Sequence, residues 1–65
     1  MELNIEWTSE KGQHYFAYYL EVLKENSRSI YAEGYYGDIY RVEKASKKVY
    51  INGVFSGVAS EFYTV

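Results

Sequence analysis

The chain has 65 residues, 20% of them aromatic, and contains nine tyrosines but no cysteine and no proline. A chain of this length forms one domain, residues 1–65, that hides only about 60% of the surface of its unfolded form, so its core is thin. Without cysteine there is no disulfide framework and no thiolate metal site. The formal net charge of −2 is too small to indicate a class of partner. Stability is therefore expected from aromatic packing, from oligomerisation, or from both.

The first predicted element is an amphipathic strand at residues 2–8. Leu3, Ile5 and Trp7 alternate with polar residues, which is the period-two pattern of a half-buried strand. The polar segment 9–12 ends in Gly12 and is typical of a tight turn, because glycine adopts positive φ without strain. A hairpin into the next segment is predicted.

Residues 13–23 fit two periodicities. In a strand, every second residue from Phe16 to Val22 would share one face, whereas a helix of two to three turns over about residues 14–25 would align Tyr15, Tyr19 and Leu23. The many aromatic and β-branched residues favour the strand. An α+β fold containing the short helix is the alternative.

Two tyrosine pairs, Tyr18-Tyr19 and Tyr35-Tyr36, suggest that aromatic side chains are exposed. Neighbouring residues on a strand point to opposite faces, so a pair in extended chain places one ring inward and one outward. We expect Tyr18 to fill the core, together with Tyr31. Tyr19 and Tyr15 would then lie on the opposite face and form a subunit interface.

Further extended segments follow along the chain. They are predicted at residues 29–36, 39–42, 49–51 and 58–64. Between the first two, the glycines of segment 34–38 indicate a bulge or corner. Asn52-Gly53 is predicted to form a turn or kink. The pattern predicts an all-β fold, a small antiparallel twisted sheet or barrel of five to six strands. An open sheet would leave an apolar face and unpaired edges, which favours a homo-oligomer.

The sequence offers little chemistry for catalysis or metal binding. His14 is the only histidine and Asp38 the only aspartate, and the serines lie in polar connections without an adjacent histidine or carboxylate arrangement that would activate one as a nucleophile. We therefore expect no enzyme activity, no cofactor and no metal, since ligand spacing for zinc or calcium is missing. No segment has the apolar length to cross a membrane, and no basic start precedes an apolar run, so a cytoplasmic location is expected.

A basic excess in residues 41–65, where four bases stand against two acids, suggests a ligand site. In single-stranded nucleic-acid or nucleotide binding, tyrosine rings stack on the bases, and neighbouring Lys or Arg side chains neutralise phosphate. A solvated hairpin tip is the simpler explanation, because the whole domain is acidic. The candidate residues for a ligand or a partner are Tyr35, Tyr36, Asp38, Tyr40, Arg41, Lys44, Lys47, Lys48 and Tyr50.

Protein recognition accounts for more of the chain than any of these chemistries, because tyrosine offers large contact area with few rotatable bonds. The leading hypothesis is a small non-enzymatic binding module, of accessory or inhibitor type, that contacts a protein partner through exposed tyrosines and carboxylates. Nucleotide or single-stranded nucleic-acid binding is one alternative, and a structural oligomer assembled through sheet edges is another.

Overall fold

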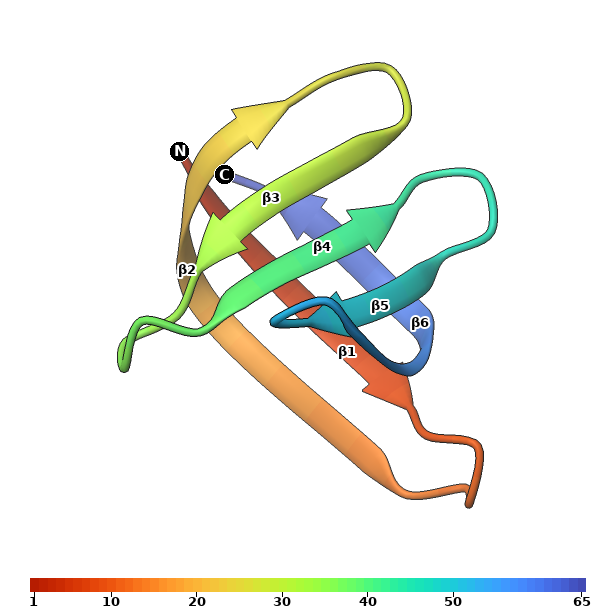
Figure 1. Cartoon of the computed structure of the whole chain (residues 1–65). Coiled ribbons are helices and arrows are strands. Elements are labelled where there is room, and N and C mark those ends of the chain that lie inside the picture. Colours follow the sequence, from red (N-terminus) through yellow and green to blue (C-terminus); the bar gives the residue numbers. More distant parts are fainter.

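The computed structural model describes residues 1–65 as six antiparallel strands without a helix (Figure 1). The antiparallel all-β prediction is confirmed. The alternative helix at about residues 14–25 is wrong, because this segment is one long strand hydrogen-bonded to a neighbour on each side. The strands are β1 (Glu2–Thr8), β2 (His14–Glu25), β3 (Ser29–Glu33), β4 (Ile39–Glu43), β5 (Lys48–Ile51) and β6 (Val54–Thr64).

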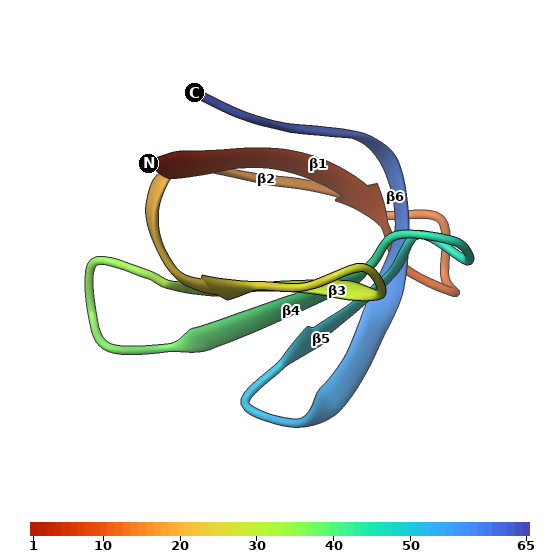
Figure 2. The ribbon, with the colours of Figure 1, turned by 90° about the horizontal axis from the view of Figure 1, so that it is seen from above.

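Hydrogen bonds run in a ring round this twisted sheet, since each strand pairs with the next and β6 pairs with β1. Seen from above, β1 and β2 lie on one side of the interior and β3 to β5 on the other, with β6 curving between them (Figure 2). Pairing is one-sided along residues 14–20 and 24–25 of β2, which pair with β1 and with β3 respectively, and along residues 54–57 and 61–64 of β6, which pair with β5 and with β1 respectively. Because each strand still has a neighbour on both sides, no whole strand is left as a free edge, as it would be in an open sheet.

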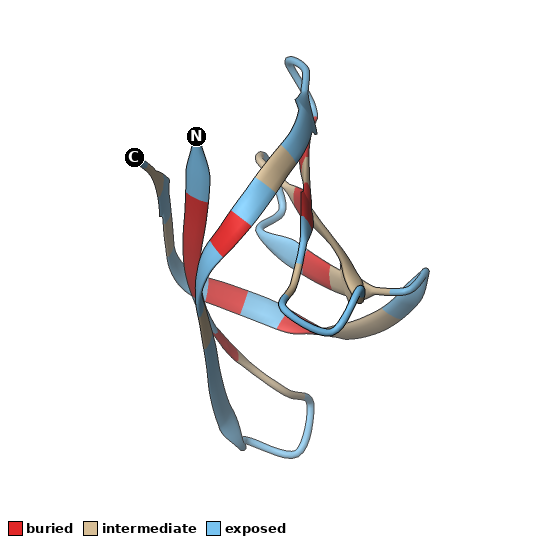
Figure 3. Cartoon of the chain, turned by 90° about the vertical axis from the view of Figure 1, so that its left-hand side faces the viewer, coloured by how far each residue is buried: buried red, intermediate tan, exposed pale blue.

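The core follows the alternation predicted for the first strand. Leu3, Ile5 and Trp7 are all buried, with at most 4% of each residue exposed. Buried positions lie along the strands, whereas the connecting loops contain none (Figure 3). The buried apolar cluster consists of Leu3, Ile5, Trp7, Leu20, Ile30, Ala32, Val42, Val49 and Ala59.

β6 begins four residues earlier than predicted, because Asn52-Gly53 forms a tight hairpin turn between β5 and β6. Both residues have positive φ, 52° and 81°, as a type I′ turn requires. Gly57 does not end the strand. It lies where β6 passes against the end of β1, and a Cβ there would collide with the backbone carbonyl of Thr8. A glycine at this position lets the two backbones approach closely.

Candidate functional site

The residues predicted to bind a ligand do not come together at one place. Tyr35, Tyr36 and Asp38 lie in the loop before β4, and Lys44 and Lys47 lie in the loop after it. The two loops are at opposite ends of β4 (Figure 1). Five residues of extended chain separate them by roughly 15 Å. The tyrosine pair and the lysines therefore form two separate surfaces.

Tyr40 belongs mainly to the interior. Its ring packs edge-on against the buried Trp7, with centroids 6.1 Å apart. Burial raises the pKa of the Tyr40 hydroxyl, and the charge of Asp38 raises it further. Asp38 is itself held by Asn52, whose Nδ2 donates to its carboxylate at 3.0 Å. The Asp38–Asn52 contact links the β3–β4 loop to the β5–β6 turn, and the packing of Tyr40 on Trp7 leaves little of its ring for stacking on a ligand.

Tyr50 lies on the outer face of the sheet beside two partners of its own. The Arg41 guanidinium sits 4.1 Å from the Tyr50 ring centroid, and the Phe55 ring packs edge-on at 5.6 Å. Arg41 also pairs with the Glu43 carboxylate, at 3.2 Å between Nη1 and Oε2. The guanidinium is thus already held by one ring and one carboxylate of its own chain.

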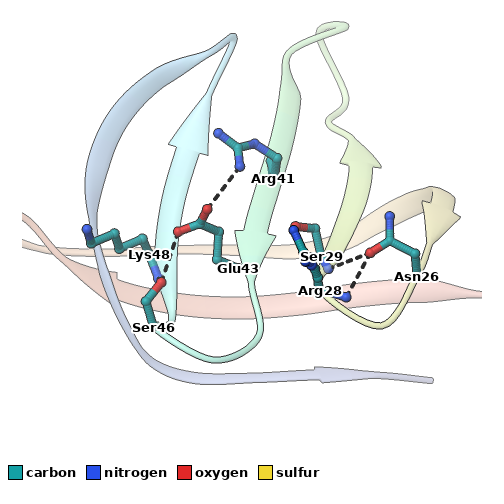
Figure 4. Close-up of polar contacts among 7 residues, drawn as sticks. All are labelled: Asn26, Arg28, Ser29, Arg41, Glu43, Ser46 and Lys48. Atoms are coloured by element: carbon teal, nitrogen blue, oxygen red, sulfur yellow. Dashed lines mark hydrogen bonds and ion pairs between the residues drawn. The ribbon is translucent and has the colours of Figure 1, made fainter.

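The basic hairpin is partly neutralised by neighbouring acids, of which Figure 4 shows Glu43. Glu43 accepts hydrogen bonds from both Arg41 and Ser46, and Lys44 pairs with Glu25 at 2.7 Å. Lys48 lies nearby, and its backbone N–H donates to the Ser46 hydroxyl. Only Lys47 and Lys48, of the four predicted cations, have no carboxylate within 4.0 Å.

A hollow of about 690 Å³ opens beside this hairpin, between the β2–β3 and β4–β5 loops. Arg28, Arg41 and Tyr31 line it, together with the Glu43 carboxylate. Backbone N–H groups of this loop, which an anion would need as donors, are already hydrogen-bonded. Those of Arg28 and Ser29 donate to the Asn26 Oδ1 at 2.8 and 2.9 Å (Figure 4). A carboxylate within the hollow and occupied N–H groups both disfavour a phosphate.

A different surface is built by an irregularity in β2. The register of β1 against β2 shifts between Leu3 and Ile5, and Tyr19 has a φ of +61°. Asn4, although buried, turns its Oδ1 toward this point and accepts the backbone N–H of Tyr19 at 2.8 Å. This bulge breaks the strict alternation of side chains, so that Tyr18 and Tyr19 are both exposed.

The expectation that Tyr18 fills the core is therefore wrong, and Tyr31 is only half-buried. Neither tyrosine pair divides between inside and outside. Tyr35 and Tyr36 lie in the β3–β4 turn, not in a strand, and are 97% and 92% exposed. Their rings pack edge to face at 5.7 Å.

The two tyrosines expected at a subunit interface lie in different surroundings. Tyr15 stacks on Trp7 with centroids 5.7 Å apart, and its hydroxyl donates to Gln13. Tyr19 stands at the bulge and is 73% exposed. Tyr15 thus partly completes the core, whereas Tyr19 belongs to an outer surface.

That outer surface extends across β6, β1, β2 and the β3–β4 loop. Phe16, which is 70% exposed, stacks on Tyr18 at 5.3 Å. Phe16 and Glu61 are the register partners of Glu6 on its two sides. We call this surface the aromatic–acidic face; it comprises Phe16, Tyr18, Tyr19, Tyr35, Tyr36 and Tyr63 with Glu2, Glu6, Glu21, Glu33 and Glu61.

Within this face the Tyr18 hydroxyl donates to the Glu6 carboxylate at 2.7 Å. The hydrogen bond to Glu6 raises the pKa of Tyr18 above its ordinary value of 10.0, with smaller contributions from desolvation and from the charge of Glu6. Tyr63 and Glu61 add to the same effect. The electrostatic influence of these groups on Tyr18 shows that they share one acidic neighbourhood.

Between β2 and the β3–β4 loop the face is hollowed, with a volume of about 410 Å³. Three tyrosines and two carboxylates from separate elements converge on this hollow. The lining residues are Tyr18, Tyr19, Glu21, Glu33, Gly34 and Tyr35.

The candidate residues named from the sequence did not include Phe16, Tyr63 or the glutamates of this face. The prediction placed Phe16 and Tyr18 on the same face of the strand as Leu20. Because of the bulge, Leu20 lies in the core whereas Phe16 and Tyr18 face outward. The one available signal was Asn4, a polar residue that the structure buries between Leu3 and Ile5. An amide in that position is suited to capping an irregular backbone opposite it.

His14, the single histidine, lies at the exposed start of β2, and its Nδ1 is 3.1 Å from the Thr8 hydroxyl. No three His, Asp or Glu side chains come together in a geometry that would hold a metal ion. None of the six elements is a helix, so no helix could cross a membrane. Searches of family models, curated proteins and solved structures gave no match to this chain.

Proposed function

We propose that this chain is a non-enzymatic protein-binding module, of accessory or inhibitor type, that contacts its partner through the aromatic–acidic face. The observation that carries the proposal is the continuity of exposed rings across this face. Phe16 stacks on Tyr18, which shares a hollow with Tyr19 and Tyr35. Exposed apolar surface of this kind, edged by polar groups, is typical of protein contact sites.

Tyrosine suits this role physically. It buries a large, rigid ring at little entropic cost, and its hydroxyl tolerates water at the edge of a contact. Aromatic side chains are enriched at interfaces for these reasons. The face also lies partly on long paired strands, so β1, β2 and β6 hold much of it in place before a partner arrives.

Nucleotide or single-stranded nucleic-acid binding is the alternative. Its residues are divided between the two ends of β4, and Arg41 and Lys44 already pair with carboxylates. Titration with single-stranded oligonucleotides and nucleotides at low salt tests it. Quenching of tyrosine emission with steep salt dependence would favour this alternative over protein binding.

Affinity purification from the source cells, read by mass spectrometry, tests the leading proposal. We expect one stoichiometric partner on the wild-type chain and its loss from the double variant Tyr35→Ser/Tyr36→Ser. Val54→Ser, which removes an exposed apolar side chain in the β5–β6 hairpin, is the matched control and should retain the partner. Retention of that partner by the double variant would contradict the proposal.

A further inference from the structure

We infer that the hollow between β2 and the β3–β4 loop receives a positively charged side chain, arginine or lysine, from a basic segment of the partner protein. The inference rests on the proposed function, because it names the partner chemistry that the same face recognises. Three tyrosines form its walls and two glutamates supply its charge.

The tyrosine walls attract cations. Each ring face carries a negative quadrupole that binds an ammonium or guanidinium group within about 6 Å of its centroid. Tyr18, Tyr19 and Tyr35 come from two elements that are far apart in sequence, and a hollow of about 410 Å³ remains between their side chains. This volume accommodates the end of one long basic side chain.

The carboxylates at the hollow lack a positive partner in the chain itself. Glu21 lies in register with Glu2 on one side and with Glu33 on the other. The only ion pairs in the molecule are Arg41 with Glu43 and Lys44 with Glu25, so none of these three glutamates is paired. Like charges directly opposite on neighbouring strands are unfavourable. A cation from a partner would relieve this repulsion.

The same chemistry occurs within the molecule on another part of the outer face. There Arg41 lies 4.1 Å from the Tyr50 ring centroid while pairing with Glu43. Lys24 similarly lies 5.7 Å from the Tyr31 ring centroid. Rings and carboxylates on that side are matched by cations of the chain. The hollow has rings and carboxylates of the same kind without the cation.

The backbone around the hollow is also unusual. Tyr19 has a φ of +61°, which is rare for a bulky residue outside turns. Such conformations persist where the surroundings hold them, and they concentrate at binding sites. Here the hydrogen bond from the Tyr19 N–H to Asn4 holds the bulge that exposes both rings.

The test uses a tri-arginine peptide with blocked ends as the probe, titrated into the isotope-labelled chain at low salt and followed by amide NMR shifts. The uncharged peptide with citrulline in place of arginine is the control probe. We expect saturable shifts at residues 18–21 and 33–35 with the arginine peptide alone. The double variant Glu21→Gln/Glu33→Gln should weaken binding at least tenfold, and Glu10→Gln, in the exposed β1–β2 turn, should not.

Equal binding of the citrulline peptide would overturn the inference, as would unchanged affinity in the glutamine variant or shifts confined to another surface. Capture of the partner by the two double variants distinguishes failure of this inference from failure of the proposed function. If Tyr35→Ser/Tyr36→Ser loses the partner and Glu21→Gln/Glu33→Gln keeps it, the protein-binding function stands and the cation site is refuted. If the tyrosine variant keeps the partner, the proposed function fails, whatever the peptide does.

Discussion

Asn4 and Trp7 are buried residues, and a polar atom in each side chain has one specific partner. The Asn4 Oδ1 accepts the Tyr19 N–H, and the Trp7 Nε1 donates to the Ser56 hydroxyl at 2.9 Å. No buried side-chain nitrogen or oxygen in the chain is left without a hydrogen bond. In a domain with so thin a core, an unpaired polar atom would remove a large part of the stability.

Replacing Ser56 by Ala should therefore destabilise the chain by about 1–3 kcal/mol, because the buried Trp7 N–H loses its acceptor. Urea unfolding followed by the fluorescence of this single tryptophan measures the change. Ser27→Ala, at an exposed loop position, is the control and should stay within about 0.5 kcal/mol of wild type. Equal stability of the two variants would show that the Trp7 hydrogen bond contributes little.

Glu6 controls the ionisation of Tyr18 on the aromatic–acidic face. Since the folded-state pKa of Tyr18 is raised above 10.0, its contribution to stability is complete below pH 10.0 and is lost as the pH rises through the folded pKa. In Glu6→Gln the Tyr18 pKa should fall toward its ordinary value, because the negative acceptor is gone. Ring NMR shifts of Tyr18 across an alkaline titration measure it, with Glu10→Gln as the control. An unchanged titration midpoint in Glu6→Gln would contradict this assignment.

At the scale of the strand, irregularities position the exposed aromatic residues. Register shifts interrupt β1 against β2, β1 against β6, and β2 against β3. Each shift turns the following residues to the other side of the strand. In β2 this change allows Leu20 to enter the core after Tyr18 has faced outward. A regular strand would have buried one residue of this tyrosine pair.

Gly57 controls how closely β6 approaches β1. Gly57→Ala should destabilise the chain by about 1–3 kcal/mol or more, because the new Cβ would meet the Thr8 carbonyl and the Ser9 backbone, which cannot yield as a side chain does. Gly12→Ala is the matched comparison, since its φ is +83° but no atom lies within 4 Å of the added Cβ. Chemical denaturation of both variants should show the larger loss for Gly57→Ala. The reverse order would exclude close approach as the reason for this glycine.

Over the whole molecule, charge is separated between two surfaces. The cations Arg28 and Arg41 line the larger hollow, and Lys44 lies in the adjacent β4–β5 loop; Arg41 and Lys44 are paired with acids. Of the six glutamates without an ion pair, all except Glu10 lie on the aromatic–acidic face. This separation concentrates the acidic side chains on one surface, which the formal net charge of −2 alone does not reveal.

Because its two register partners are also glutamates, Glu21 should be unfavourable for folding in the free chain. Glu21→Gln should raise the free energy of unfolding by about 0.2–1 kcal/mol at low salt. The gain should shrink as salt screens the repulsion, with a Debye length of about 10 Å at 0.1 M. Glu25→Gln, which loses the pair with Lys44, should bring no gain. Thermal unfolding at two salt concentrations provides the measurement, and a stability loss in Glu21→Gln would contradict like-charge repulsion at this site.

Local patterns predicted much of the fold. Alternation at Leu3, Ile5 and Trp7 identified the first buried face, and aromatic content correctly favoured a strand over a helix at β2. The candidate site was harder to predict. The basic hairpin was predicted as a site because its cations are close in sequence. Their partners come from other strands: Lys44 pairs with Glu25 of β2, and Arg41 packs on the Tyr50 ring of β5. Phe16 and Tyr63 are 47 positions apart and join one face only through β1.

The sequence alone determined the kind of fold, because alternation, turn residues and aromatic content act over a few neighbouring residues. It also determined that aromatic surface would remain exposed, since so short a chain cannot bury all of its tyrosines. Only the tertiary structure decided which tyrosines these are. The direction of Tyr18 and Tyr19 depends on the bulge at Tyr19, which depends in turn on Asn4 lying opposite it, whereas Tyr35 and Tyr36 are exposed because they lie in the β3–β4 turn. The register of three strands likewise places Glu21 between Glu2 and Glu33. The sequence could not predict this placement, because strand pairing joins residues that are distant in the chain and no local pattern specifies it.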